Sequence, residues 1–370
     1  MEKRKNGKIE LIRFIFTMFI VFYHCQRHYL KGVVYAGHFT FFARGYIGVE
    51  FFFLVTGFFM ARTAYKYGSK LPQTAGAEPG AASGLGRETA SFVWRKMKAI
   101  LPYHFSAFGI ILAVTAIYER QSVGEVIKTI FNSVPGLLLF SKTGFNFGNL
   151  NRVEWYLIAM IFTLMILYPL CRKYYSMYVY VIAPMGGMFI LGYLTTNFGS
   201  LVGGGASTWN GAVYTCMLRA LAEISLGASC FEFARRLQEI SLTKRQKLFL
   251  TAAENGCYLF SFLFVISNLD AKYSIYALLA LFLAVGLTLS GVTHGSRMFD
   301  NRVCYFLGSS SLIVYLSQVL PLDMVKALFP DSSGYGKTLI MVLLTLANAV
   351  LCSFVVKAFR AVYRKYRSGR

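Results

Sequence analysis

The chain has 370 residues, of which 56% are hydrophobic and only 15% are charged, and its formal net charge is +22. A soluble domain usually has closer to a quarter of charged residues, so the composition excludes that class and indicates a helical membrane protein that crosses the bilayer several times. The seven cysteines form neither a Cys-x-x-Cys pair nor a Cys/His spacing, so we predict neither a metal site nor a disulfide framework.

The first apolar segment, residues 9–29, contains two ionisable side chains, Arg13 and His24. Eleven residues bring a helix to within about 20° of three full turns, so the two side chains share one helix face, about 16 Å apart along the axis. Ionisable groups are expensive at membrane depth and mark a functional site by default. We therefore assign both residues to a candidate site.

Ten apolar stretches are long enough to cross a bilayer, which takes about 20 residues. They lie near residues 9–29, 46–66, 99–119, 153–171, 177–196, 212–234, 247–267, 272–292, 303–326 and 337–358. The stretch 125–140 is too short and too charged to span, and we predict an interfacial helix there. The expected fold is an all-α bundle of about ten transmembrane spans, with residues 1–370 forming a single membrane-embedded domain.

The loops between the spans predict the orientation of the chain. The alternate loops that include both termini, counted with the span ends beside them, hold 26 of the 38 Lys and Arg residues, and the opposite set holds 10. By the positive-inside rule, both termini are cytoplasmic in a multi-pass protein of the cell membrane. The Gly-, Ala-, Ser- and Pro-rich segment 68–91 is then a flexible cytoplasmic loop. A basic rim facing anionic lipid headgroups explains the net charge, so we expect no nucleic-acid partner.

Glu50, in the second span, lies near the outer side at a depth similar to that of His24. A carboxylate that hydrogen-bonds one imidazole nitrogen orients the ring and strengthens the other nitrogen as a base. This placement predicts a catalytic His24–Glu50 dyad. A pair at headgroup level that merely satisfies two polar side chains explains the same positions equally well.

Three cations, Arg95, Lys96 and Lys98, stand at the cytoplasmic start of the third span. Cations at a membrane mouth suit a phosphate-rich ligand, and Arg supplies a planar bidentate fork for it. Ordinary positive-inside anchoring is the alternative explanation for these residues.

Polar and aromatic residues also mark the fourth and sixth spans. Asn151, Trp155 and Tyr156 at the outer start of the fourth span suit a pocket for a sugar acceptor, although an interfacial aromatic belt explains the Trp and Tyr about as well. Arg219 and Glu223 in the sixth span are four residues apart and oppositely charged. They are predicted to form a structural ion pair inside the bundle.

Five segments, in chain order, resemble the acyltransferase 3 family of integral-membrane O-acyltransferases. The run IELIRFIFTMFIVFYH resembles the first helix of the family, and GYIGVEFFFLVTGFFMA its second-helix signature. WRKMKAILPYH resembles the basic segment and NLNRVEWYLIAMIFTLMILYP the Trp-Tyr-Leu helix. LGSSSLIVYLSQVLP, which contains Tyr315 and Gln318, resembles the late Leu-Gly-x-x-Ser motif.

The resemblance implies that the protein transfers an acyl group, commonly acetyl, from cytoplasmic acyl-CoA to a hydroxyl of a cell-surface carbohydrate or a lipid-linked envelope precursor. His24 would be the general base and Glu50 its support, with no bound cofactor. The donor-binding residues would be Arg13, Arg95, Lys96 and Lys98. The acceptor pocket would comprise Asn151, Trp155, Tyr156, Tyr315 and Gln318.

A transporter or flippase for a polar envelope precursor is the alternative function, because intramembrane Arg, His and Glu residues also mark transport pathways. That class is typically built from internal repeats and from paired helices broken at Gly or Pro. We find neither pattern in the sequence, so we predict the enzyme.

Overall fold

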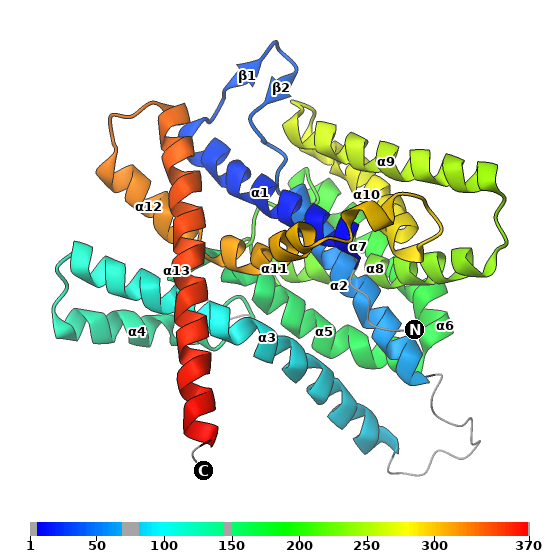
Figure 1. Cartoon of the computed structure of the whole chain (residues 1–370), viewed down its shortest axis with the longest axis horizontal. Helices are drawn as coiled ribbons and strands as arrows, with labels where there is room; N and C mark the ends of the chain where they lie inside the picture. Colours follow the sequence, from blue (N-terminus) through cyan, green and yellow to red (C-terminus); the bar gives the residue numbers. More distant parts are fainter. Residues whose placement is uncertain (1–5, 69–80, 144–149, 369–370) are drawn as a thin grey trace.

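The computed structural model describes residues 6–68, 81–143 and 150–368 and is 79% helical, with almost no sheet (Figure 1). This confirms the predicted all-α, polytopic bundle. Residues 69–80 of the predicted 68–91 loop lie outside the described residues, whereas residues 81–91 form the first turns of a 38-residue helix, α3. The cytoplasmic placement of the termini stays a prediction.

The helices are α1 (Gly7–Tyr29), α2 (Ile47–Gly68), α3 (Ala81–Tyr118), α4 (Val123–Leu137), α5 (Trp155–Lys173), α6 (Tyr175–Met177), α7 (Ala183–Phe198), α8 (Thr215–Glu239), α9 (Lys244–Ile266), α10 (Ser274–Ser290), α11 (Arg302–Leu316), α12 (Val319–Leu328) and α13 (Gly334–Ser368). A π-helical turn, η2 (Tyr178–Ile182), joins α6 to α7, and short 3-10 turns are η1 (Arg152–Glu154), η3 (Ala271–Tyr273) and η4 (Ser296–Phe299). Two short strands, β1 (Val34–Tyr35) and β2 (Phe39–Thr40), form an antiparallel hairpin after α1.

Eight helical segments in the described part of the chain are long and apolar enough to cross a membrane. The predicted span 303–326 is broken in two, because α11 and α12 meet at 56°, and the bent pair would make a ninth span. The predicted span 212–234 is helix α8, which is not among those segments. Its position explains its polarity, because 15 of its 25 residues are buried and it packs against α2, α5, α7 and α10.

Helices α2 and α8 approach very closely through two glycines. A Cβ atom on Gly57 would lie 1.9 Å from the backbone oxygen of Ile224, and one on Gly227 would lie 2.1 Å from that of Leu54. Small residues at helix crossings let backbones approach in this way in membrane proteins. The α2 face that contains Leu54 and Gly57 is therefore fixed against α8.

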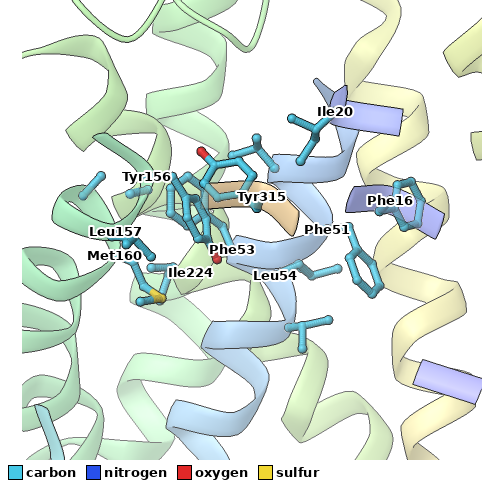
Figure 2. Packing of buried hydrophobic residues seen from close by; sticks show 14 of the residues in the cluster. Phe16, Ile20, Phe51, Phe53, Leu54, Tyr156, Leu157, Met160, Ile224 and Tyr315 are labelled. Atoms are coloured by element: carbon cyan, nitrogen blue, oxygen red, sulfur yellow. The ribbon is translucent and has the colours of Figure 1, made fainter. Parts of the chain in front are cut away.

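An aromatic cluster connects α1, α2, α5 and α11. Figure 2 shows the side chains of Tyr156 and Tyr315 gathered beside Phe53, while Phe51 points away from them towards Phe16. The ring centroids of Phe53 and Tyr156 are 4.7 Å apart, and those of Tyr156 and Tyr315 are 5.7 Å apart in an edge-on arrangement. These tilted and edge-on contacts are favourable aromatic geometries, so the cluster fixes the relative positions of the helices around the candidate site.

The break between α11 and α12 is closed by side-chain amides. Three successive carbonyls there accept hydrogen bonds from the side chains of three residues. The pairs are Gln318 with Tyr315 (2.9 Å), Asn151 with Leu316 (3.0 Å) and Asn348 with Ser317 (2.9 Å). Backbone groups that a helix break frees inside a membrane need such partners.

Candidate active site

A cavity of about 300 Å³ lies among α1, α2, α3, α5 and α11. Its ionisable lining residues are Glu10, Arg13, Lys96, Tyr156 and Tyr315. Ligand pockets typically enclose about 300–1,000 Å³, so the cavity has the size of a small binding site. Each of the five helices contains, or directly adjoins, one of the five motif segments, so the bundle brings those segments together around one space.

Two cations line the cavity, Arg13 from α1 and Lys96 from α3. Nη1 of Arg13 lies 2.9 Å from a carboxylate oxygen of Glu10. Lys96 forms no ion pair with any described carboxylate, and its ammonium group lies 5.8 Å from the ring centroid of Phe92. One carboxylate therefore balances two cations, which leaves this part of the cavity with excess positive charge.

The other two predicted donor-binding residues, Arg95 and Lys98, are exposed and do not line the cavity. Arg95 lies 3.4 Å from the hydroxyl of Ser91, and the Lys98 ammonium lies 5.4 Å from the ring centroid of Trp94. Successive residues of a helix are turned by about 100°, so Lys96 faces inward with Ala99 and Ile100 while its neighbours face outward. The structure thus brings only two of the four predicted donor-binding cations to the cavity.

His24 lies one helical turn beyond Ile20, which lines the cavity, and on the same face of α1 as Arg13. The ring is partly buried and packs beside Tyr23, at 5.6 Å between centroids. Among the described residues, none donates a hydrogen bond to His24 or accepts one from it. Both ring nitrogens are therefore without a hydrogen-bond partner in the described part of the chain, so either one is available to a ligand.

The predicted dyad of His24 and Glu50 is not formed, because Glu50 binds Arg219 of α8 instead. The Arg219 guanidinium lies 3.2 Å from a Glu50 oxygen and 2.9 Å from a Glu223 oxygen, and all three side chains are at most 2% exposed. Glu50 shares its α2 face with Leu54 and Gly57, which contact α8, and this explains the partner. The predicted ion pair of Arg219 and Glu223 is confirmed, as part of this buried triad.

Two basic residues, Arg27 and His28, follow His24 in the last turn of α1. Arg152 belongs to η1 and is paired with Asp323 of α12 at 2.7 Å. The end of α1 also contacts α12, because the Tyr29 hydroxyl donates a 2.8 Å hydrogen bond to the carbonyl of Leu322. Helix α12 therefore connects the end of α1 to η1, which lies in the Trp-Tyr-Leu segment.

The predicted acceptor residues divide into two groups. Tyr156 and Tyr315 line the cavity, and the Tyr315 hydroxyl donates a 2.8 Å hydrogen bond to the carbonyl of Val153. Asn151 and Gln318 do not line the cavity. Their amides donate hydrogen bonds to backbone carbonyls at the break between α11 and α12. Trp155 packs against Phe53 and the Arg219 guanidinium, whose carbon lies 6.0 Å from the indole ring.

A second pair of a histidine and a glutamate, which the sequence analysis missed, lies in the interior. Nδ1 of His104 is 3.8 Å from a carboxylate oxygen of Glu154, and Nε2 lies 3.1 Å from the carbonyl oxygen of Leu137. Both side chains are at most 1% exposed, and neither Glu154 oxygen has a hydrogen-bond partner. The only sequence signal was the position of His104 at the end of the basic motif.

Comparison with known proteins identifies the family. A family model described as an acyltransferase domain matches residues 6–358. No curated protein and no solved structure matches the chain. The matched region covers nearly the whole chain and includes all five motif segments and every helix around the cavity. The chain belongs to the acyltransferase 3 family and is an acyltransferase enzyme.

Proposed function

We propose that the protein is an O-acyltransferase of the cell membrane that moves an acyl group, commonly acetyl, from cytoplasmic acyl-CoA to a hydroxyl of a cell-surface carbohydrate or envelope precursor. His24 is the general base in this proposal. The observation that carries it is the arrangement of α1, where one helix face presents Arg13 to the cavity and His24 just beyond it. Cation and base are thus about three helical turns apart along one wall.

The donor enters at the end of the cavity that Arg13 and Lys96 line. Their excess positive charge suits the phosphates of coenzyme A, and the Arg fork binds a phosphate in a bidentate manner. A volume of about 300 Å³ is at the lower limit for a ligand pocket. We therefore assign the cavity to the thioester arm and place the nucleotide at its mouth.

The reaction follows from a neutral His24 beside the acceptor. A ring nitrogen removes the hydroxyl proton as the acceptor oxygen bonds to the thioester carbonyl carbon, which forms a tetrahedral intermediate. The carbon–sulfur bond then breaks, and the coenzyme A thiolate takes the proton from the imidazolium. The ester product and free coenzyme A balance the reaction without an acyl-enzyme. Tyr156 and Tyr315 provide aromatic surface for the acceptor.

The test uses purified protein in proteoliposomes, with acetyl-CoA labelled in the acetyl group and an envelope glycan extract as acceptor. We expect His24→Ala to lower acyl transfer by about 10²- to 10⁴-fold, the usual contribution of a general base. His28→Ala, the same change one helical turn further along α1, should retain transfer.

A second pair of variants tests the donor end. Lys96→Met should raise the KM for acetyl-CoA, whereas Lys98→Met, on the outward face of the same helix, should leave it unchanged. If a labelled envelope precursor crosses the membrane in the His24→Ala variant without consumption of thioester, the protein acts as a transporter or flippase and the proposal is wrong.

A further inference from the structure

A second pocket, of about 400 Å³, lies at the end of the bundle where α1 ends. Its walls are the last two turns of α1, the β1–β2 hairpin with the segments on either side of it, and Asn268 between α9 and α10. In Figure 1 the hairpin projects between the end of α1 and α9. The backbone N–H of Asn268 donates to the carbonyl of His38 at 2.8 Å, and that of Arg44 to Val265 at 3.1 Å. These bonds fix the walls to α9 and its connection to α10.

The pocket is strongly cationic. Arg27, Lys31 and Arg44 line it, and no Asp or Glu does. Arg27 donates a 3.2 Å hydrogen bond to the Tyr23 hydroxyl, and Arg44 donates a 3.0 Å bond to the Leu269 carbonyl. Within residues 6–68, 81–143 and 150–368, none of the three cations forms an ion pair. Three positive charges in one pocket without a carboxylate favour an anionic ligand.

Membrane anchoring does not explain these charges. By the positive-inside rule, this end of the bundle faces outward, where Lys and Arg are normally depleted. Only 10 of the 38 Lys and Arg residues lie in the loops and adjoining span ends of that side, and three of those ten line this pocket. The nearby Arg152, in contrast, is neutralised by Asp323.

The pocket adjoins the proposed base. Tyr23, which lines the pocket, precedes His24 and contacts its ring at 5.6 Å between centroids. Arg27 follows His24 by three residues, which corresponds to about 4.5 Å along the helix axis. Arg27 and His24 are therefore less than one helical turn apart along α1, although His24 itself does not line the pocket.

We propose that this pocket binds an anionic group, a phosphate or carboxylate, on the molecule that accepts the acyl group. The acceptor class is then an acidic or phosphorylated sugar rather than a neutral one. This inference rests on the proposed function, because it takes His24 as the base that receives the acceptor hydroxyl. Arg27 supplies the planar fork for the anion, and Lys31 and Arg44 add charge around it.

The experiment measures binding, so that it does not depend on catalysis. Full-length protein is placed in nanodiscs of phosphatidylcholine alone, and equilibrium binding of radiolabelled inorganic phosphate and of glucuronate is measured. We expect the double variant Arg27→Gln/Lys31→Gln to bind both probes at least tenfold more weakly than the wild type. Arg44→Gln is made separately, because Arg44 also anchors the backbone at Leu269.

The matched control is the double variant Lys244→Gln/Arg245→Gln, which removes two exposed cations at the other end of α9. It should bind both probes as the wild type does. Equal binding by wild type and by Arg27→Gln/Lys31→Gln would overturn the proposal. So would loss of probe binding when phosphatidylglycerol replaces half of the lipid, measured against phosphatidylcholine nanodiscs in the same high salt that screens the charge of the bilayer surface. The pocket would then be a lipid-headgroup site.

An acyl-transfer arm links the pocket to the acceptor. With labelled acetyl-CoA, the wild type should label the anionic fraction of an envelope glycan extract, and Arg27→Gln/Lys31→Gln should label it at least tenfold less. Labelling confined to the neutral fraction would refute the acceptor class. A wild type that binds phosphate but consumes no acetyl-CoA would instead refute the proposed function and leave the anion pocket in place.

Discussion

Replacing Arg219 should destabilise the protein far more than replacing either of the carboxylates that it binds. The guanidinium donates three hydrogen bonds, to Glu50, to Glu223 and to the backbone carbonyl of Tyr46. Arg219→Met removes all three and leaves two carboxylates, both fully buried, without a cation. Glu50→Gln leaves the pair of Arg219 and Glu223 intact.

The magnitudes follow from burial. Breaking a buried ion pair by removal of one partner costs about 3–5 kcal/mol, because the remaining charge is uncompensated. We expect this loss for Arg219→Met. For Glu50→Gln we expect a change of about 1 kcal/mol or less, because the second oxygen of each carboxylate already lacks a hydrogen-bond partner and the variant removes one excess negative charge.

The assay is reversible unfolding in mixed micelles, with Arg236→Met as the control. Arg236 lies on the same helix and is paired with Glu232 and Glu239, but its side chain is 59% exposed. Exposed pairs contribute about 0–1 kcal/mol, so the control should unfold almost as the wild type does. If Arg219→Met and Arg236→Met were equally stable, the buried triad would not hold α2 against α8 and the reasoning would be wrong.

Three further predictions concern stability. Gly57→Ala should abolish the folded, monodisperse protein in gel filtration, because the added Cβ would lie 1.9 Å from a backbone oxygen of α8. The control Gly256→Ala, whose Cβ meets open space, should fold normally, and a well-folded Gly57→Ala protein would contradict the close helix crossing. Glu154→Gln should raise the unfolding free energy by about 1 kcal/mol, because neither oxygen of the buried Glu154 carboxylate has a hydrogen-bond partner. A lower melting temperature of this variant would show that the structure compensates the charge of Glu154. Tyr315→Phe loses a 2.8 Å hydrogen bond and should cost about 1 kcal/mol, and an unchanged unfolding midpoint would argue against that bond.

The helical segments and the polar face of α1 were predictable because both depend on local properties of the sequence. Apolar length defines a span, and the 3.6-residue period alone places Arg13 and His24 on one face. The pair of Arg219 and Glu223 was predictable for the same reason, since residues four apart meet on any helix. The break in the span 303–326 was not predictable, because two of the amides that bond its free carbonyls, those of Asn151 and Asn348, come from distant segments.

The partner of Glu50 depends on which face of α2 meets which helix. The face with Val49, Phe52 and Val55 lines the cavity, and the face with Glu50 and Leu54 meets α8. Each face carries one polar side chain among apolar ones, Thr56 on the cavity face and Glu50 on the other, so hydropathy does not distinguish the two faces. The similar membrane depth of the two residues suggested His24 as the partner of Glu50. The actual partner, Arg219, depends on how α2 packs against α8.

The pair of His104 and Glu154 was missed for a related reason. Both residues lie near the ends of apolar segments, where a polar side chain is usually solvated. His104 is buried where α4 packs against α3, and the carbonyl of Leu137 at the end of α4 takes up one nitrogen of its ring. No pattern in α3 or α5 predicts that contact.

The amides at the break between α11 and α12 also bear on how the protein works. In transporters with discontinuous helices, the unwound carbonyls commonly coordinate an ion and the half-helices move against each other. Here the carbonyls of Tyr315, Leu316 and Ser317 are already occupied by Gln318, Asn151 and Asn348. Each carbonyl of this set already accepts a hydrogen bond from a side-chain amide, and any movement of α12 would have to break the bonds from Asn151 beside η1 and from Asn348 of α13. These bonds hold the bend rigid next to Tyr315. A rigid wall of this kind suits a site that must keep a substrate in place during proton transfer.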